Sequence, residues 1–186
     1  MNYAKIKKCD IANGEGVRVT LFVSGCRNKC KGCFQPETWD FNYGDEFTSE
    51  VEMEIVSALE NPSVRGLTIL GGEPMEPENQ EALLPFLVKV KNLFPEKTIW
   101  LYTGNLYEEL TGMLGEHRSC IDVTERLLSL VDILVDGRYI EEEKCLGLRF
   151  RGSKNQRIID MNETRRLGEV IIWSGCREDK IYENQN

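Results

Sequence analysis

Short apolar segments and amphipathic segments alternate along this chain of 186 residues, and the alternation limits the possible folds more than any other feature. The apolar segments have the length and composition of strands. They lie at about 17–23, 66–71, 97–103 and 131–136, with a possible edge strand at about 5–9. Strands separated by helices are joined by parallel crossovers. The pattern therefore predicts an α/β fold.

Three of the intervening segments have helical periodicity. In the first, Ser49 and Glu52 have the spacing of a capping box, so we expect a helix to begin there. The second covers about 78–93, where Pro85 predicts a kink or two short helices. A third, short helix is expected to end near Leu130. Four or five such units are too few for a complete eight-stranded barrel of about 250 residues. An open, partial β/α barrel is the better prediction.

We expect a single domain over residues 1–186. The chain is long enough for a substantial core, and no internal repeat, low-complexity block or linker divides it. The core is expected over about 5–160. The tail, about 165–186, contains one apolar run at 170–173 whose place in the fold the sequence does not decide.

Three cysteines, Cys26, Cys30 and Cys33, follow the first parallel strand with C-x3-C-x2-C spacing. Cysteine thiolates hold iron–sulfur clusters, usually four to a cluster. Three thiolates can hold a four-iron cluster and leave the fourth iron open to a substrate or cofactor, as the open position of a catalytic metal does. The triplet therefore predicts a reactive [4Fe-4S] cluster. The competing interpretation is a structural zinc site, but the sequence offers no fourth ligand at finger-like spacing.

A second motif, Gly71-Gly72-Glu73-Pro74, follows the second parallel strand. By itself it would be an ordinary strand-to-helix turn. Ligands of open α/β sheets bind at the carboxyl ends of the strands, and both motifs lie at such ends. The two glycines allow a close approach of the backbone. Together the motifs indicate one site that is shared by two loops.

With these motifs in this order, the chain resembles the radical S-adenosylmethionine (SAM) superfamily. Within it, the chain looks most like the branch of glycyl-radical-enzyme activases that serves the anaerobic ribonucleoside-triphosphate reductase. The match extends from about residue 2 to residue 160. The further blocks that carry it are 13–18, 34–41, 131–137, 151–153 and 155–160.

The resemblance implies a partial barrel of the radical SAM type, with a [4Fe-4S] cluster and SAM as cofactors. In this branch the reduced cluster passes one electron to the sulfonium of SAM. The resulting 5′-deoxyadenosyl radical takes a hydrogen atom from a glycine of the reductase. The implied partners are the glycyl-radical subunit of the reductase and a low-potential electron donor such as flavodoxin. Because cofactors carry the chemistry, no residue of this chain is expected to act as a general acid or base.

The resemblance also implies which residues form the site. The three cysteines would hold the cluster, and its fourth iron would bind the methionine end of SAM. Glu73, or a backbone carbonyl beside it, is expected to bind the amino group of SAM. The full set of residues expected to contact SAM is Gly71, Gly72, Glu73, Phe34, Thr103, Asp136 and Arg151.

Gly32 departs from the pattern of many superfamily members, which place an aromatic residue there to touch adenine. Adenine contacts are therefore expected from Phe34 or from the strand end at 102–104. Asp136 has an equal alternative as a capping or solvated residue. The segment around Arg151 and residues 155–157 is as compatible with a solvated face as with contact to SAM or to the glycine loop of the partner.

The overall composition excludes several other classes of protein. A net charge of −8 and a pI near 4.9 argue against non-specific binding of nucleic acid. No apolar stretch approaches the roughly 20 residues that cross a bilayer, and the basic N-terminus lacks the apolar core of a signal peptide. Seven cysteines, an odd number, do not suggest a secreted disulfide scaffold. We therefore expect a cytoplasmic protein.

The residues with thiol or imidazole side chains outside the triplet have simpler interpretations. The histidine, His117, lies in a polar stretch and is expected to be solvated. The scattered cysteines are expected to be incidental thiols, and they are Cys9, Cys120, Cys145 and Cys176.

Two other functions stay open at this point. The chain could activate another glycyl-radical enzyme such as pyruvate formate-lyase, although those related activases typically run longer. It could also be a non-catalytic Fe–S electron carrier or a zinc-stabilised adaptor. Either of these would have a fully ligated metal that ignores SAM.

Overall fold

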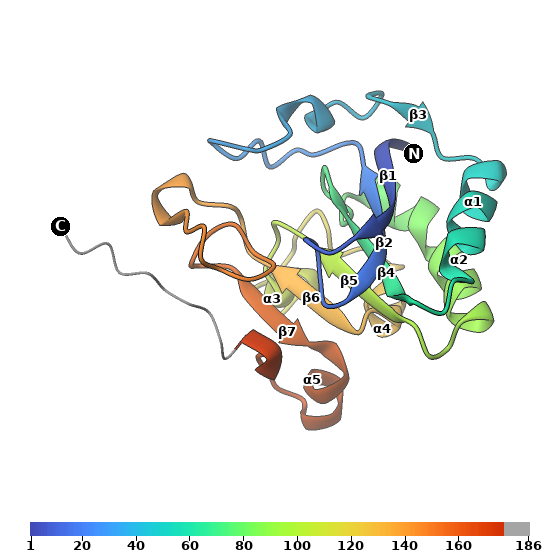
Figure 1. The fold of residues 1–186 in the computed structure, drawn as a ribbon. Helices are drawn as coiled ribbons and strands as arrows, with labels where there is room; N and C mark the ends of the chain where they lie inside the picture. The colour runs from blue at the N-terminus through green and yellow to red at the C-terminus, as the bar shows by residue number, and fades with distance from the viewer. Residues whose placement is uncertain (177–186) are drawn as a thin grey trace.

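The structure, a computed structural model, describes residues 1–176 and contains one mixed sheet flanked by helices (Figure 1). Part of the predicted tail, 177–186, lies outside the described residues. The sheet has seven strands within the described part, in the order β3-β1-β2-β4-β5-β6-β7. Their bounds are β1 (Asn2–Asp10), β2 (Val17–Val23), β3 (Asp45–Glu46), β4 (Val64–Gly71), β5 (Thr98–Tyr102), β6 (Ile133–Asp136) and β7 (Arg157–Asp160).

The four central strands, β2, β4, β5 and β6, are parallel, which confirms the predicted α/β class. The outer strands are antiparallel: β1 pairs with β2, β3 with β1, and β7 with β6. The possible edge strand at about 5–9 is part of β1, and because β3 pairs only with Asn2 and Tyr3, the segment 5–9 lies at the edge of the described sheet, as predicted. Because the central strands run the same way, their carboxyl ends meet at one edge of the sheet.

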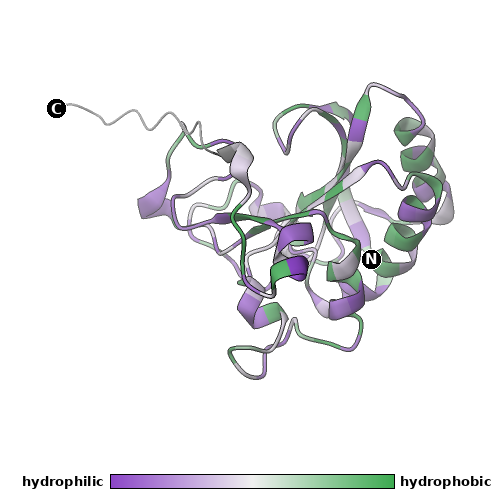
Figure 2. Ribbon diagram, turned by 90° about the horizontal axis from the view of Figure 1, so that it is seen from below, coloured by the Kyte–Doolittle hydropathy of each residue, from purple (hydrophilic) through white to green (hydrophobic). Residues whose placement is uncertain are grey.

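The helices α1, α2 and α4 pack on one face of the sheet. Apolar side chains that alternate along the strands form a continuous core with these helices, and green and purple segments alternate along the helices in Figure 2. The bounds are α1 (Ser49–Leu59), α2 (Pro77–Leu93), α3 (Tyr107–Leu110), α4 (Thr124–Leu130) and α5 (Met161–Leu167). Short 3-10 helices cover Pro36–Trp39, Glu141–Glu143 and Ser174–Cys176.

The opposite face of the sheet carries a smaller apolar cluster. Trp100 of β5 packs there against Phe150 and Trp173, with ring centroids 5.3 and 5.1 Å away. This contact gives the undecided run at 170–173 its place, since the Trp173 backbone N donates to the Ile158 oxygen of β7. The run therefore lies against the last strand and closes this face.

Two expectations about helices need correction: the capping box is absent, and of the two alternatives at Pro85 the pair of short helices does not form, whereas the kink stays a prediction. The N-cap of α1 is Thr48, which makes no side-chain capping bond, so Ser49 and Glu52 form no capping box. α2 is one helix from Pro77 to Leu93, with Pro85 inside it. Pro85 and Glu81, the residue one turn earlier, both lie on the exposed side. The Glu81 carbonyl that loses its intrahelical partner can therefore be hydrated.

Candidate functional site

A cavity of about 440 Å³ lies at the carboxyl ends of the central strands, at the edge where β2, β4, β5 and β6 all end. It is lined by residues of the loops that follow these strands and by the segment 144–156. Every predicted site residue except Asp136 lines it. The structure thus brings the cysteine triplet and Gly71-Gly72-Glu73 to one place, as their positions after parallel strands predicted.

The cysteine loop, residues 24–33, turns sharply at both of its glycines. Gly25 has φ 92° and Gly32 has φ 72°, a conformation that favours glycine. The Gly25 backbone N donates to Thr38 O at 2.8 Å, and a Cβ on Gly25 would lie 2.4 Å from the Phe41 ring. Cys26 is buried, whereas Cys30 and Cys33 are half-buried. The loop is therefore packed at its first cysteine and more open at the other two.

The backbone at Gly32 favours glycine over an aromatic residue at this position. Its φ of 72° is one that residues with side chains rarely adopt, and a Cβ there would lie 2.8 Å from Oε1 of the half-exposed Glu141 side chain, which would have to move. Phe34 is 66% exposed at the cavity instead, and its ring lies 5.3 Å from that of Tyr139. Sequence reasoning missed Tyr139. Its position just after the carboxyl end of a predicted parallel strand was the available signal.

Gly71 and Gly72 allow the loop after β4 to run beside the cysteine loop. The Gly72 backbone N donates to Val23 O at 2.7 Å, and the Glu73 backbone N donates to Gly25 O at 2.8 Å. A Cβ on Gly72 would lie 2.6 Å from Gly25 O. The two glycines are therefore needed for the close approach of two backbones.

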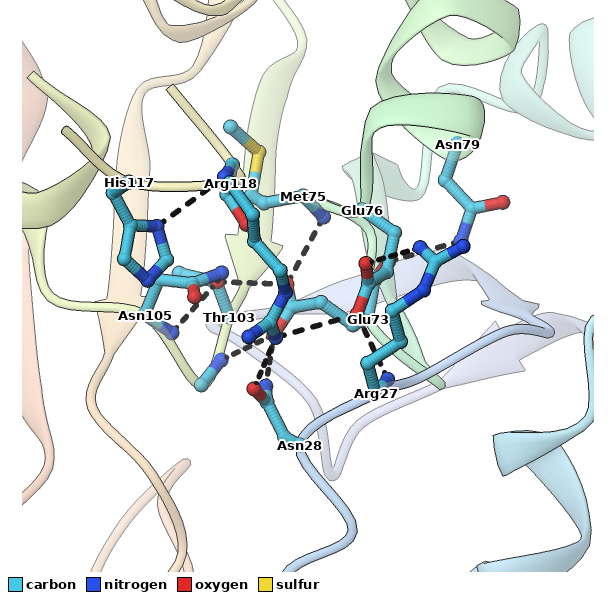
Figure 3. Close-up of polar contacts among 12 residues, drawn as sticks. Arg27, Asn28, Glu73, Met75, Glu76, Asn79, Thr103, Asn105, His117 and Arg118 are labelled. Atoms are coloured by element: carbon cyan, nitrogen blue, oxygen red, sulfur yellow. Dashed lines mark hydrogen bonds and ion pairs between the residues drawn. The ribbon is translucent and has the colours of Figure 1, made fainter. Parts of the chain in front are cut away.

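The Glu73 carboxylate joins three loops (Figure 3). The side chain is 1% exposed. Oε1 accepts from Thr103 Oγ1 at 2.7 Å and from Met75 N at 2.9 Å, and Oε2 accepts from Asn28 Nδ2 and Gly104 N, both at 2.8 Å. Burial raises the pKa of this carboxyl above its usual range. With four donors on its two oxygens, Glu73 organises the cavity wall. Direct binding of SAM by its carboxylate stays a prediction.

The three thiols fit the demands of a cluster. They lie on one loop and line one cavity, and thiolate is the ligand that iron–sulfur clusters take. No three His, Cys, Asp or Glu side chains in residues 1–176 are grouped as ligands of a single metal ion. A cluster makes a different demand, because each thiolate binds a different iron atom. The three cysteines are therefore the residues that would hold it.

In the metal-free protein, Cys26 and Cys30 hold their protons more tightly than free cysteine does. Burial, with a smaller contribution from the charge of Glu73, raises the pKa of Cys26 to about 11. Burial and the neighbouring Cys33 raise the pKa of Cys30. Metal ligands must be deprotonated, so cluster assembly has to release these protons.

This predicts a strong pH dependence of Cys26 alkylation in metal-free protein. Because only the thiolate reacts, we expect Cys26 to react with iodoacetamide about 100-fold more slowly than exposed Cys120 near pH 8. Since the pKa is raised, the rate should increase about tenfold per pH unit between about pH 8 and pH 10. Mass spectrometry of the labelled peptides measures both rates. Equal rates for the two cysteines would contradict the burial of Cys26.

Asp136 and Arg157 form an ion pair away from the cavity. Asp136 is fully buried and accepts from Arg157 Nε at 2.9 Å, from Arg157 Nη2 and from Tyr107 N at 2.8 Å. Arg157 also donates to Glu108 at 2.6 and 2.9 Å. The two carboxylates raise the pKa of Arg157. This pair joins β6, β7 and α3, and a role of Asp136 in binding SAM stays a prediction without support from its position.

Asp136→Asn is expected to lower the free energy of unfolding by about 3 kcal/mol, because it leaves a half-buried guanidinium with one carboxylate partner fewer. This corresponds to a fall in Tm of about 6–12 °C for a domain of this size. Glu163→Gln is the matched control, since Glu163 pairs with Arg166 on the surface and should change stability by less than about 0.5 kcal/mol. Thermal unfolding by circular dichroism measures both. Equal stabilities would show that the buried pair contributes nothing.

Arg151 lines the cavity from the segment before β7. Its Nη1 donates to the Gln156 carbonyl at 2.9 Å. Gln156 Oε1 accepts from Gly152 N at 2.8 Å and from Ser153 N at 3.2 Å. This turn holds itself together through Gln156 and brings the guanidinium of Arg151 to the cavity wall.

The residues expected to be incidental are only partly so. Cys9 and Cys120 are exposed, but Cys145 lines the same cavity as the triplet, and the side chain of Cys176 lies outside the described part of the structure. The expectation that His117 is solvated was wrong. Its side chain is 19% exposed, and Nδ1 accepts from Ser119 N at 3.2 Å.

The helices between residues 1 and 176 include none that is long and apolar enough to cross a membrane.

Comparison with known proteins identifies the family. The model of the 4Fe-4S single cluster domain matches residues 12–159, which include the triplet and Gly71-Gly72-Glu73. The chain is 42% identical to the anaerobic ribonucleoside-triphosphate reductase-activating protein of Vibrio cholerae over 158 residues, 84% of this chain and 96% of that relative. It is 41% identical to the protein of this name from Haemophilus influenzae over 159 residues, 84% and 96% of the two chains. For Enterobacteria phage T4 the identity is 40% over 160 residues, 85% and 93%. The chain therefore belongs to the family of anaerobic ribonucleoside-triphosphate reductase-activating proteins, and it contains a 4Fe-4S single cluster domain.

Proposed function

We propose that this protein is a radical SAM activase for the anaerobic (class III) ribonucleoside-triphosphate reductase. It would hold a [4Fe-4S] cluster through Cys26, Cys30 and Cys33, bind SAM beside it, and install a glycyl radical on the reductase. The observation that carries the proposal is that the triplet and Gly71-Gly72-Glu73 line the same cavity. The names of the relatives, which describe activators of this reductase, support the choice of partner.

The cavity suits a small cofactor. Its volume of about 440 Å³ lies within the range of about 300–1,000 Å³ that is usual for ligand sites. Its wall combines aromatic and glycine residues with a few polar groups. Phe34 and Tyr139 offer rings for a base, Arg151 offers a cation for a carboxylate, and the backbone around Gly72 offers carbonyls for an amino group.

When bound, the cluster and SAM would supply one-electron reductive cleavage of the S–C5′ bond and, through it, removal of a hydrogen atom from the partner glycine. The chain itself binds, orients and shields. Two residues of the cavity wall, Glu73 and Thr103, are only 1% and 5% exposed, so this part of the wall is tightly packed. No general acid or base on the chain is needed.

Several finer features belong to the same proposal. The sheet and its helices would form a partial barrel of the radical SAM type, with the cavity at the mouth. The electron donor would be a low-potential carrier such as flavodoxin, and the protein would work in the cytoplasm.

The test is release of 5′-deoxyadenosine by protein reconstituted with iron and sulfide, under strict anoxia with dithionite and SAM. Product from wild type and from Cys120→Ala, but not from Cys30→Ala, is the expected result. Addition of the reductase should then give the EPR doublet of a glycyl radical. A radical formed on pyruvate formate-lyase instead would change the partner. Zinc in anaerobically isolated protein, with no cleavage of SAM even with the reductase present, would overturn the proposal in favour of an adaptor.

A further inference from the structure

A network of hydrogen bonds and ion pairs binds the part of the cysteine loop that lies between Cys26 and Cys30 (Figure 3). Arg27 and Asn28 are the loop residues in this network. Two buried carboxylates, Glu73 and Glu76, and the guanidinium of Arg118 bind them. Arg118 belongs to the loop between α3 and α4, about 90 residues further along the chain.

Glu76 binds the loop directly after the first cysteine. Its side chain is 0% exposed. Oε1 accepts from the backbone N of Arg27 at 2.8 Å, and Oε2 accepts from Arg27 Nη1 at 2.7 Å. Glu76 is also the N-cap of α2, a position that favours Ser, Thr, Asp or Asn, yet it makes no side-chain capping bond. Its carboxylate binds the cysteine loop in place of its own helix.

Asn28 links the loop to Glu73 and to Arg118. Its Nδ2 donates to Glu73 Oε2 at 2.8 Å, and its Oδ1 accepts from Arg118 Nη2 at 2.6 Å. A Cβ on Gly104 would lie 2.5 Å from Asn28 Nδ2, so the amide fits a narrow space. Asn28 also lines the cavity. One amide thus fixes the peptide between Cys26 and Cys30 from two sides.

Arg118 adds positive charge where the network is otherwise rich in carboxylates. Its Nη2 lies 3.4 Å from Glu76 Oε1, and its side chain is about one-third exposed. Arg27, the other cation, is shared between Glu76 and Glu78. Net charge and nearby hydrogen bonds set the reduction potential of iron–sulfur clusters. A cation next to the loop stabilises the reduced, more negative state.

We propose that Asn28 and Arg118 are positioning residues for the cluster. Asn28 holds the loop between Cys26 and Cys30 against Glu73, and the charge of Arg118 raises the reduction potential of the cluster that the triplet binds. This inference rests on the proposed cluster at the three cysteines. It gives the loop between α3 and α4 a role in setting the reduction potential of that cluster.

The test is a potentiometric titration of the reconstituted full-length protein, followed by the EPR signal of the reduced cluster. Arg118→Gln should lower the midpoint potential by at least 59 mV, a tenfold change in a one-electron equilibrium. Arg118→Lys should restore most of this shift. Arg166→Gln on α5, which removes the same charge from a surface pair, should leave the potential within a few millivolts of wild type.

Asn28→Ala tests positioning separately from charge. We expect an altered EPR line shape of the reduced cluster at an unchanged iron content. A wild-type potential in Arg118→Gln, or a wild-type line shape in Asn28→Ala, would overturn the corresponding half of the inference. Absence of any reduced-cluster signal from wild type would count against the proposed function. The two failures are therefore distinguishable.

Discussion

Cys26→Ala, Cys30→Ala and Cys33→Ala should each lose the iron–sulfur cluster and more than 99% of SAM cleavage. The reason is that the proposed cluster has only three protein ligands. Loss of a group that only hydrogen-bonds to a metal ligand already costs about 10–100-fold in metal affinity or activity, so loss of a ligand itself should cost more. Iron and sulfide content and the visible absorbance of the reconstituted protein measure the cluster. Release of 5′-deoxyadenosine measures the activity. A variant that keeps wild-type iron content would remove that cysteine from the ligand set.

The other cysteines provide matched controls for this prediction. Cys120→Ala, at an exposed position, should keep both cluster and activity. Cys145→Ala is the sharper control, because Cys145 lines the same cavity as the triplet. It too should keep the cluster. If it loses the cluster, a fourth cysteine is a ligand and the open iron atom on which the proposed chemistry depends does not exist.

Glu73→Ala should lower the free energy of unfolding of the metal-free protein by about 4 kcal/mol. The substitution leaves donors from Asn28, Met75, Thr103 and Gly104 without their acceptor at a buried position. Each unsatisfied buried group costs about 1–3 kcal/mol, and relaxation of the loops recovers part of the sum. Urea denaturation followed by circular dichroism measures the change.

Glu73→Gln should lower the free energy of unfolding by less than Glu73→Ala, about 2 kcal/mol, because the amide keeps one acceptor oxygen. The remaining cost arises because the NH₂ group of the amide faces the donors that the other carboxylate oxygen had accepted from. Both variants should also bind SAM weakly in the reconstituted protein, since the wall of the cavity is no longer held. Glu78→Gln is the control, because Glu78 lies half-exposed at the surface end of the same network. Wild-type stability of Glu73→Ala would show that the three loops do not depend on this carboxylate.

The position of the site could be predicted because two regularities of the sequence coincide. The cysteine triplet and Gly71-Gly72-Glu73 each follow a segment that forms a parallel strand, and parallel strands end at the same edge. The roles of single residues were harder to predict. Asp136 is the last residue of a parallel strand, but its carboxylate is bound by Arg157 of β7, a strand that no sequence pattern had indicated. A residue at the carboxyl end of a parallel strand therefore need not line the cavity.

The thiol ligands, the alternation of strands and helices around them and the family could be predicted from the sequence alone, because ligand type, spacing and periodicity are local properties of the chain. Only the tertiary structure decided which distant groups meet them. Arg118 reaches Asn28, Glu76 binds Arg27 in place of its own helix, and Glu141 takes the space beside Gly32. Each of these contacts joins residues far apart in sequence. Such contacts depend on how the whole chain packs, so they cannot be predicted from the spacing or type of neighbouring residues.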